Sequence, residues 1–156
     1  MHKIAIIKGD GTGPEVINEA IKVLTAASEI TGCKLTYTDL NYDGTRYLDT
    51  GETLSDSELQ GLKDYDAILL GAIGHPEIKP GILERDILLK LRFDLDLYIN
   101  LRPVKLYSNV STPLANVTPD QIDYVVVREN TGGLYTGIGG SSMTGTENEI
   151  ASQSMV

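Results

Sequence analysis

The first part of the chain alternates between short apolar runs and a segment with helical spacing. Residues 3–7 (KIAII) and 66–70 (DAILL) are short, aliphatic and followed by glycines, which is typical of buried strands. Apolar residues from Ile17 to Ala27 recur at helical spacing after Pro14, so they predict a helix that begins near the proline. Strand–helix–strand order predicts a layered α/β fold with a largely parallel sheet at the start.

Weaker patterns predict further elements before residue 97. Residues 34–40 alternate between polar and apolar side chains in the manner of a strand. Ser55 and Glu58 form a capping-box pattern, which predicts a short helix. Residues 82–96 have mostly helical character with leucine-rich faces.

The second half of the chain predicts two strands and the start of a helix. Residues 98–106 and 123–128 are strand-like, and the turn formers of residues 107–120 are expected to join two lobes. Thr146 and Glu149 resemble the opening of a helix. Because the sequence stops a few residues later, we expect it to be a fragment that ends inside an element.

Composition and charge narrow the classes of function. The chain has 156 residues, 41% of them apolar, and a net charge of -9, which argues against nucleic acids and anionic membranes as partners. The apolar run at the N-terminus is too short for a signal or membrane segment. Cys33 is the only cysteine, so we expect a small buried side chain and a reducing cytoplasm.

The arginines carry the first candidate chemistry. Only five are present, and three of them lie at Arg92 in the helical run, at Arg102 in a strand and at Arg128 at a strand end. A guanidinium presents a planar fork of donors that matches a carboxylate. Three forks that converge would form a pocket for a small acid with more than one carboxylate. Tyr135 follows Arg128 after a glycine-rich turn and could move a proton beside these cations.

Two leucines precede Arg92 on the helical run. Leu88 lies four residues before Arg92, so the two side chains stack on one helix face, and Leu89 lies one step round the helix. A cation beside two leucines suits a ligand with a carboxylate and a branched alkyl tail. The alternative is an amphipathic helix whose leucines face the core and whose arginines are solvated.

Glycine-rich loops follow both buried strands of the first part. Residues 9–16 (GDGTGPEV) lie between a strand and a helix, where backbone amides bind anions. They lack the dinucleotide-binding fingerprint, because Pro14 occupies the position of its third glycine. Residues 71–74 (GAIG) follow the second strand, and ligands bind at such strand ends. A plain nucleotide-binding domain is therefore a further alternative, and its affinity would not depend on the arginines.

Together these segments resemble the β-decarboxylating 2-hydroxyacid dehydrogenases, a family that includes 3-isopropylmalate, isocitrate and tartrate dehydrogenases. The resemblance is carried by IIKGDGTGPEV, DAILLGAIG, LLKLRFDLDLYINLRP, VVVRENTGGLYTG and TENEIASQSMV. It implies the layered α/β sheet of this family rather than a Rossmann fold. It also implies that residues 1–99 begin a cofactor-side domain and residues 100–156 begin a substrate and dimerisation domain, each completed by later parts of the family's chain.

The resemblance implies roles for the candidate residues. The three arginines would hold the carboxylates of the substrate, the tyrosine would protonate the enolate formed on decarboxylation, and a loop would border the nicotinamide of NAD. Mg2+ or Mn2+, a catalytic lysine and a homodimer partner are implied as well, with the metal ligands outside this chain, so the chain alone is expected to be inactive. The implied residues are Arg92, Arg102, Arg128 and Tyr135, with Leu88 and Leu89 at the substrate and Ala72, Ile73 and Gly74 at the cofactor.

The choice of substrate depends on the residues before Arg92. Isocitrate enzymes resemble S-x-N-x-x-L-R there, whereas this chain has Asp86 and Leu88 in place of the serine and asparagine. Asp86 repels an anion, and the leucines suit an isopropyl group whose burial contributes on the order of 2 kcal/mol. This favours oxidation and decarboxylation of (2R,3S)-3-isopropylmalate to 2-oxoisocaproate, a step of leucine biosynthesis. Arg85 stands where many isopropylmalate enzymes carry glutamate, and residues 82–96 (ILERDILLKLRFDLD) resemble an actinobacterial branch instead. Tartrate-type or isocitrate-type activity, or a non-catalytic carboxylate-binding subunit, therefore stays open.

Overall fold

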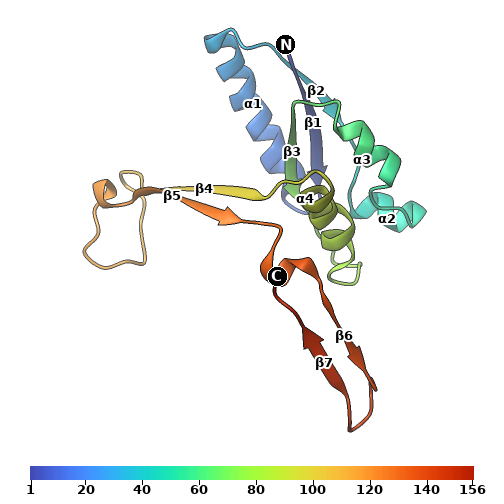
Figure 1. Cartoon of the computed structure of the whole chain (residues 1–156). Coiled ribbons are helices and arrows are strands. Elements are labelled where there is room, and N and C mark those ends of the chain that lie inside the picture. The colour runs from blue at the N-terminus through green and yellow to red at the C-terminus, as the bar shows by residue number, and fades with distance from the viewer. The chain divides into compact units, whose positions relative to one another are not determined.

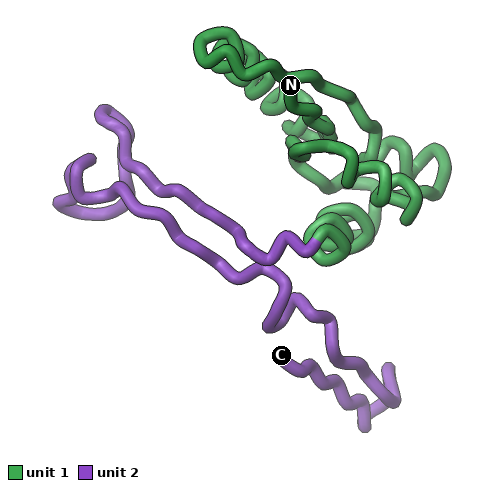
Figure 2. Tube along the Cα trace, turned by 45° about the horizontal axis from the view of Figure 1, so that its top comes forward, with its two compact units in different colours: residues 1–95 green, residues 96–156 purple.

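The computed structural model describes all 156 residues, which divide into two compact units. Unit 1 comprises Met1–Leu95 and unit 2 comprises Asp96–Val156 (Figure 2). The assignment of a cofactor role to residues 1–99 and a substrate role to residues 100–156 stays a prediction. No helix in either unit is long and apolar enough to cross a membrane.

Unit 1 is built on a parallel three-stranded sheet. Strand β1 (His2–Gly9) lies in the middle, between β2 (Leu35–Asp39) and β3 (Ala67–Ala72) (Figure 1). Both neighbours pair with β1 in parallel. The predicted α/β arrangement with a parallel sheet is therefore confirmed.

Helix α1 (Gly13–Thr31) covers one face of this sheet. Proline stands in its first turn and Gly32 ends it with a left-handed φ of 71°, as the sequence predicts. Its inner side places Ile17 against Ile4 and Ile6 of β1. Cys33, in the turn after Gly32, is exposed, so the expectation of a buried cysteine is wrong: a surface turn offers no core to pack against.

The other face of the sheet carries four short helical segments. These are α2 (Gly44–Thr50), α3 (Asp56–Leu62), the π-helix η1 (Glu84–Leu89) and α4 (Lys90–Asp94). The sequence predicts α3 and its capping box, both confirmed, but gives no sign of α2. The helix expected over residues 82–96 is interrupted by the π-helical turn. The core on this face contains Ala5, Ile7, Leu54, Leu59, Leu62, Leu83, Ile87 and Leu91.

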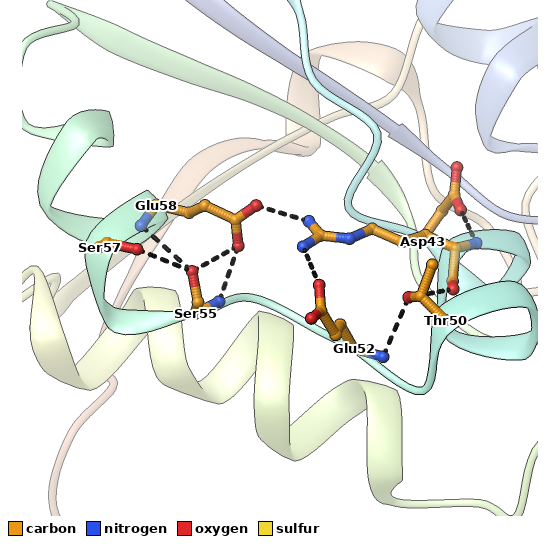
Figure 3. A network of polar contacts seen from close by, with 7 residues as sticks. Asp43, Thr50, Glu52, Ser55, Ser57 and Glu58 are labelled. Carbon is orange, nitrogen blue, oxygen red and sulfur yellow. Dashed lines mark hydrogen bonds and ion pairs between the residues drawn. The ribbon is translucent and has the colours of Figure 1, made fainter.

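A polar network around Arg46 joins α2 to α3 (Figure 3). The Arg46 guanidinium donates to Glu58 at 2.8 Å and to Glu52 at 3.1 Å, and it lies 5.3 Å from the centre of the Tyr42 ring. Burial works to raise the pKa of Glu58, but hydrogen bonds from the side chain and backbone of Ser55 and from Arg46 outweigh it and hold that pKa below its usual value. Arg46 of α2 therefore connects its own helix to Glu52, which follows that helix, and to Glu58 in the first turn of α3.

Unit 2 consists of two antiparallel strand pairs. Strands β4 (Ile99–Lys105) and β5 (Asp123–Glu129) form one pair, and β6 (Gly139–Ser142) and β7 (Ile150–Gln153) form the other. Residues 107–120 connect the paired strands β4 and β5. The expectation that they join two lobes is therefore wrong, because the units divide at residues 95 and 96.

A turn replaces the helix expected at Thr146. The Thr146 hydroxyl donates to the Met143 carbonyl at 2.7 Å, and the Glu149 carboxylate accepts from the Gly145 amide at 2.9 Å, within the connection from β6 to β7. Threonine and glutamate satisfy backbone groups in turns as readily as at helix starts. The threonine and glutamate therefore indicate that side chains satisfy backbone groups here, but they do not distinguish a turn from the start of a helix.

Apolar side chains remain uncovered in both units. On α1, Val16, Val23 and Ile30 are 61%, 69% and 87% exposed, and they follow one another at seven-residue intervals along a single helix face. In unit 2, Leu101 and Val127 are more than half exposed on the pair β4–β5. Large apolar patches mark surfaces that other parts of a protein cover.

Candidate functional site

The register of β4 and β5 places Arg102 and Arg128 on the same face of their strand pair. Asn100 pairs with Arg128, and Arg102 pairs with Val126. Residues directly opposite each other share a face, as do residues two apart along a strand. The two arginines are therefore diagonal neighbours, with backbones about 7–8 Å apart.

Tyr135 joins this pair of arginines. It lies in the 3-10 turn η3 (Gly133–Thr136), and its ring centre is 4.7 Å from the guanidinium carbon of Arg128. Such a distance is that of a cation–π contact. Unit 2 thus brings together three of the four residues that the resemblance assigns to carboxylate binding and proton transfer, namely Arg102, Arg128 and Tyr135.

Glu129 and Asn130 complete the turn between Arg128 and Tyr135, and neither was predicted from the sequence. The Glu129 carboxylate accepts three hydrogen bonds from the next residues of the chain, and hydrogen bonds from Thr131, the side chain first, lower its pKa to about 2. Asn130 is 6% exposed and donates from Nδ2 to the Leu97 carbonyl at 3.3 Å. The sequence gives no specific signal for this turn, because the usual side chains that bond the backbone two residues on are those of Asn, Asp, Ser and Thr rather than Glu.

The leucine pair of unit 1 lies apart from the core. Ile87 and Leu91 are buried in the core cluster, whereas Leu88 and Leu89 are half-buried and belong to neither core cluster. The alternative in which all the leucines of this segment pack into the core is therefore wrong for these two. Arg92 is half-buried in α4, one turn after Leu88.

The π-helix η1 places charged residues just before the leucines. Arg85 Nε and Nη2 donate to the two carboxylate oxygens of Asp86 at 2.6 and 3.0 Å. This contact is the largest cause that raises the pKa of Arg85 and lowers that of Asp86. Each charge is thus neutralised by its neighbour. π-Helical turns occur frequently at functional sites.

A buried carboxylate organises the loops at the carboxyl ends of the strands. Asp10, 5% exposed, follows β1 and accepts from the Gly44 amide at 2.8 Å and from the Gly74 amide at 3.1 Å. Gly9 pairs with Ala72, so the ends of β1 and β3 are adjacent. One side chain therefore fixes three loops at the edge of the sheet where ligands bind in such folds.

The loop assigned to the cofactor has open space before it. Gly74 has a φ of 149°, which side chains disfavour, and a Cβ there would meet only Glu84 Oε1 at 4.0 Å. A hollow of about 200 Å³ begins at Gly74 and is lined further by His75, Lys79 and Glu84. His75 accepts the Glu77 amide at Nδ1 over 3.3 Å, which is a local turn contact. The space beside Gly74 is therefore not filled by other backbone or side-chain atoms of the loop.

The chain contains no group of three or more His, Cys, Asp or Glu side chains that could hold a metal ion. The predicted site residues are divided between the units. Arg92, Leu88, Leu89 and Ala72, Ile73 and Gly74 lie in unit 1, and Arg102, Arg128 and Tyr135 lie in unit 2. The meeting of Arg92 with the other arginines stays a prediction.

Sequence comparison connects this geometry to known proteins. The family described as isocitrate/isopropylmalate dehydrogenase matches residues 3–155. A 3-isopropylmalate dehydrogenase of Thermobifida fusca is 50% identical over 154 residues, which cover 99% of this chain and 44% of that protein. Those of Corynebacterium aurimucosum and Mycobacterium avium are 54% and 55% identical. The chain spans less than half the length of these relatives.

Solved structures show the same fold. The crystal structure of isocitrate dehydrogenase from Methylococcus capsulatus is 30% identical, with a TM-score of 0.74, and the match covers 100% of this chain and 42% of that one. A β-decarboxylating dehydrogenase from Thermococcus kodakarensis matches with a TM-score of 0.66 at 30% identity. The predicted fold class is confirmed by these matches.

Proposed function

Because the chain belongs to the isocitrate/isopropylmalate dehydrogenase family, we propose that it forms the N-terminal part of an enzyme that oxidises and decarboxylates 3-isopropylmalate with NAD. One observation carries the proposal: Arg102 and Arg128 share a strand face, and Tyr135 lies against Arg128. Two guanidinium groups and a phenol on one surface suit a substrate that carries carboxylates and later needs a proton.

The residues of this chain have distinct tasks in the proposed reaction. Arg92, Arg102 and Arg128 bind the carboxylates and hold the hydroxyl-bearing carbon in place. Ala72, Ile73 and Gly74 would border the nicotinamide of NAD, which would supply the hydride acceptor for the oxidation. After carbon dioxide leaves, Tyr135 donates its phenolic proton to the carbanionic carbon of the enolate. Arg128 lies 4.7 Å from the ring centre of Tyr135, so the phenol is adjacent to a cation that binds a carboxylate.

Leu88 and Leu89 are proposed to select the alkyl substituent. They are half-buried and absent from the core, so they are available to a ligand. Burial of an isopropyl group contributes roughly 2 kcal/mol, or about thirtyfold in affinity. Asp86 offers no hydrogen-bond donor to a third carboxylate, and both of its oxygens already accept from Arg85. These features support 3-isopropylmalate over isocitrate.

Mg2+ or Mn2+, with ligands outside these 156 residues, and assembly as a homodimer stay part of the proposal. Tartrate-type or isocitrate-type dehydrogenases remain alternatives within the same chemistry. A non-catalytic carboxylate-binding subunit is the alternative of a different class. The pair of arginines on one face of β4 and β5 would bind an acid in such a subunit equally well.

An assay with two proteins tests the proposal. The first is the 156-residue chain. The second is a chimera in which Val156 is joined to the remaining part of the Thermobifida fusca relative. We call this chimera the full-length enzyme. Each is given NAD, Mg2+ and either 3-isopropylmalate, isocitrate or tartrate. We expect NADH formation only from the full-length enzyme, with 3-isopropylmalate as the preferred acid. If the chimera is folded and binds the acid without turnover, the result supports the non-catalytic binding subunit. Turnover by the 156-residue chain alone would contradict the proposal that residues outside this chain are needed for catalysis.

A further inference from the structure

The segment between Arg128 and Tyr135 is folded by a single carboxylate. Glu129 Oε1 accepts from the Thr131 amide at 2.7 Å and from the Thr131 hydroxyl at 2.5 Å, and Oε2 accepts from the Gly132 amide at 2.8 Å. All three donors lie within three residues of the acceptor. The strand therefore ends in a closed turn instead of an open loop.

This turn leads directly into the segment that holds Tyr135. The Gly132 carbonyl accepts from the Tyr135 amide at 3.4 Å, and the Gly133 amide donates to the Val156 carbonyl at 2.8 Å. A Cβ at Gly132 would meet Glu129 Oε2 at 3.1 Å and the Val156 carbonyl oxygen at 3.2 Å, so the turn fits closely around the carboxylate. The position of the phenol thus follows from the position of the turn.

The charge of Glu129 is directed away from Arg128. Neighbouring residues of a strand point to opposite faces, so Glu129 and Arg128 are separated although they are adjacent in sequence. The carboxylate is occupied by the hydrogen bonds of the turn. The cation of Arg128 is consequently not neutralised by the residue next to it, and it faces the Tyr135 ring.

We propose that Glu129 is a positioning residue, whose carboxylate closes the turn of residues 130–132 and thereby holds the Tyr135 phenol over the Arg128 guanidinium. The inference rests on the proposed function, because it takes Tyr135 as the proton donor. It adds a residue that touches neither substrate nor cofactor. Removal of the carboxylate loosens the turn, and the phenol loses its fixed distance to the carbon that it protonates.

Kinetics of the full-length enzyme test this role. Glu129→Ala is expected to lower kcat by ten- to a hundredfold while KM for the acid changes less than threefold, because Arg102 and Arg128 stay in their strands. Glu129→Gln, which keeps one acceptor oxygen, is expected to recover part of the loss. Asp123→Asn is the matched control, since Asp123 is an exposed, ion-paired carboxylate at the other end of the same strand. It should leave kcat unchanged.

A solvent isotope effect separates positioning from general destabilisation. If the phenol is displaced, proton transfer becomes slower and kcat in deuterated solvent falls further in Glu129→Ala than in the parent enzyme. Loss of folded enzyme lowers kcat without a change in this ratio. An unchanged kcat, or a lower kcat with an unchanged isotope effect, overturns the inference. A parent enzyme that lacks activity contradicts the proposed function instead.

Hydrogen exchange gives a test that needs no activity. In the parent protein, the amides of Thr131 and Gly132 should exchange at least tenfold more slowly than those of Ala115 and Asn116, which lie exposed in the connection between β4 and β5. Glu129→Ala should remove this protection, and Asp123→Asn should keep it. Equal exchange of the two segments in the parent protein overturns the inference even if the variant does not fold.

Discussion

The guanidinium of Arg128 lies 4.7 Å from the ring centre of Tyr135, although seven positions separate them in the sequence. The contact is made within one unit, by a strand and the short turn that follows it. A guanidinium over an aromatic ring is attracted to the face of that ring. In the proposed function this cation also binds a carboxylate of the substrate beside the proton donor. Changes to either residue, or to the strands that hold them, should therefore be measurable in the kinetics.

Arg128→Lys in the full-length enzyme should lower kcat/KM by at least tenfold, which corresponds to about 1.4 kcal/mol. Lysine keeps the charge but loses the planar fork that binds a carboxylate in two places and stacks on a ring. Steady-state kinetics with 3-isopropylmalate measure the change. A variant with parent kinetics would show that charge alone suffices and that the stacked geometry has no role.

Arg102→Ala in the same enzyme should also lower kcat/KM by at least tenfold, or about 1.4 kcal/mol. Its side chain shares a strand face with Arg128, and the proposed function assigns it to a carboxylate of the substrate. Lys105→Ala is the control, because Lys105 lies in the same strand on the opposite face and pairs with Asp123. If both variants behave alike, Arg102 is not part of the site.

Leu88→Asn should lower kcat/KM for 3-isopropylmalate by roughly thirtyfold, as expected for the loss of an isopropyl contact of about 2 kcal/mol. Activity with malate, which has no alkyl substituent, should change by much less. The ratio of the two substrates is therefore the measurement. An equal loss for both acids would mean that Leu88 supports the fold and does not select the substrate.

Not all of this geometry was predictable from sequence. Pro14 and Gly32 mark the ends of α1 because their backbone preferences are local, and short aliphatic runs followed by glycines mark β1 and β3. The sequence also predicts the three arginines as a group. Helix α2 was not predicted, although Asp43 caps its start and Gly51 ends it, because its seven residues are too few to show a helical period. The π-helical turn before Lys90 was not predicted either, because its apolar spacing resembles that of an α-helix.

The roles of Glu129 and Asp10 depend on where the chain turns. Glu129 bonds residues two and three positions ahead, and Asp10 bonds Gly44 and Gly74, which are far away in sequence. The residue spacings that identify helices and strands predict neither the contacts of Glu129 nor those of Asp10. The capping box at Ser55 was predictable because its spacing is fixed by helix geometry.

Acid should weaken the turn at Glu129. Its pKa is about 2, below the ordinary 4.5, because hydrogen bonds from Thr131 and Gly132 favour the ionised carboxylate. The contribution of this group to stability is therefore complete above pH 4.5 and is lost as the pH falls toward 2. The difference in urea midpoint between the parent chain and Glu129→Gln should be constant from neutral pH to about 5 and should shrink below it. A constant difference down to the lowest pH would contradict the pKa assignment.

Arg46→Ala should destabilise the protein by roughly 1 to 3 kcal/mol, because Glu58 would be left partly buried without its charged partner. Urea unfolding of the parent chain and the variant measures this loss. Lys22→Ala removes an exposed ion pair with Glu19 and should cost less than about 1 kcal/mol. If the two variants are equally stable, the Arg46 network contributes no more than a surface pair.

The most direct test is a crystal structure of the full-length enzyme with 3-isopropylmalate bound. We expect the guanidinium groups of Arg92, Arg102 and Arg128 to contact the carboxylates of the acid at about 2.7–2.9 Å, with the isopropyl group against Leu88 and Leu89. Arg92 is the decisive residue, because it comes from the other unit of the chain. An acid bound elsewhere, or bound without Arg92 and the two leucines, would contradict the proposed substrate site.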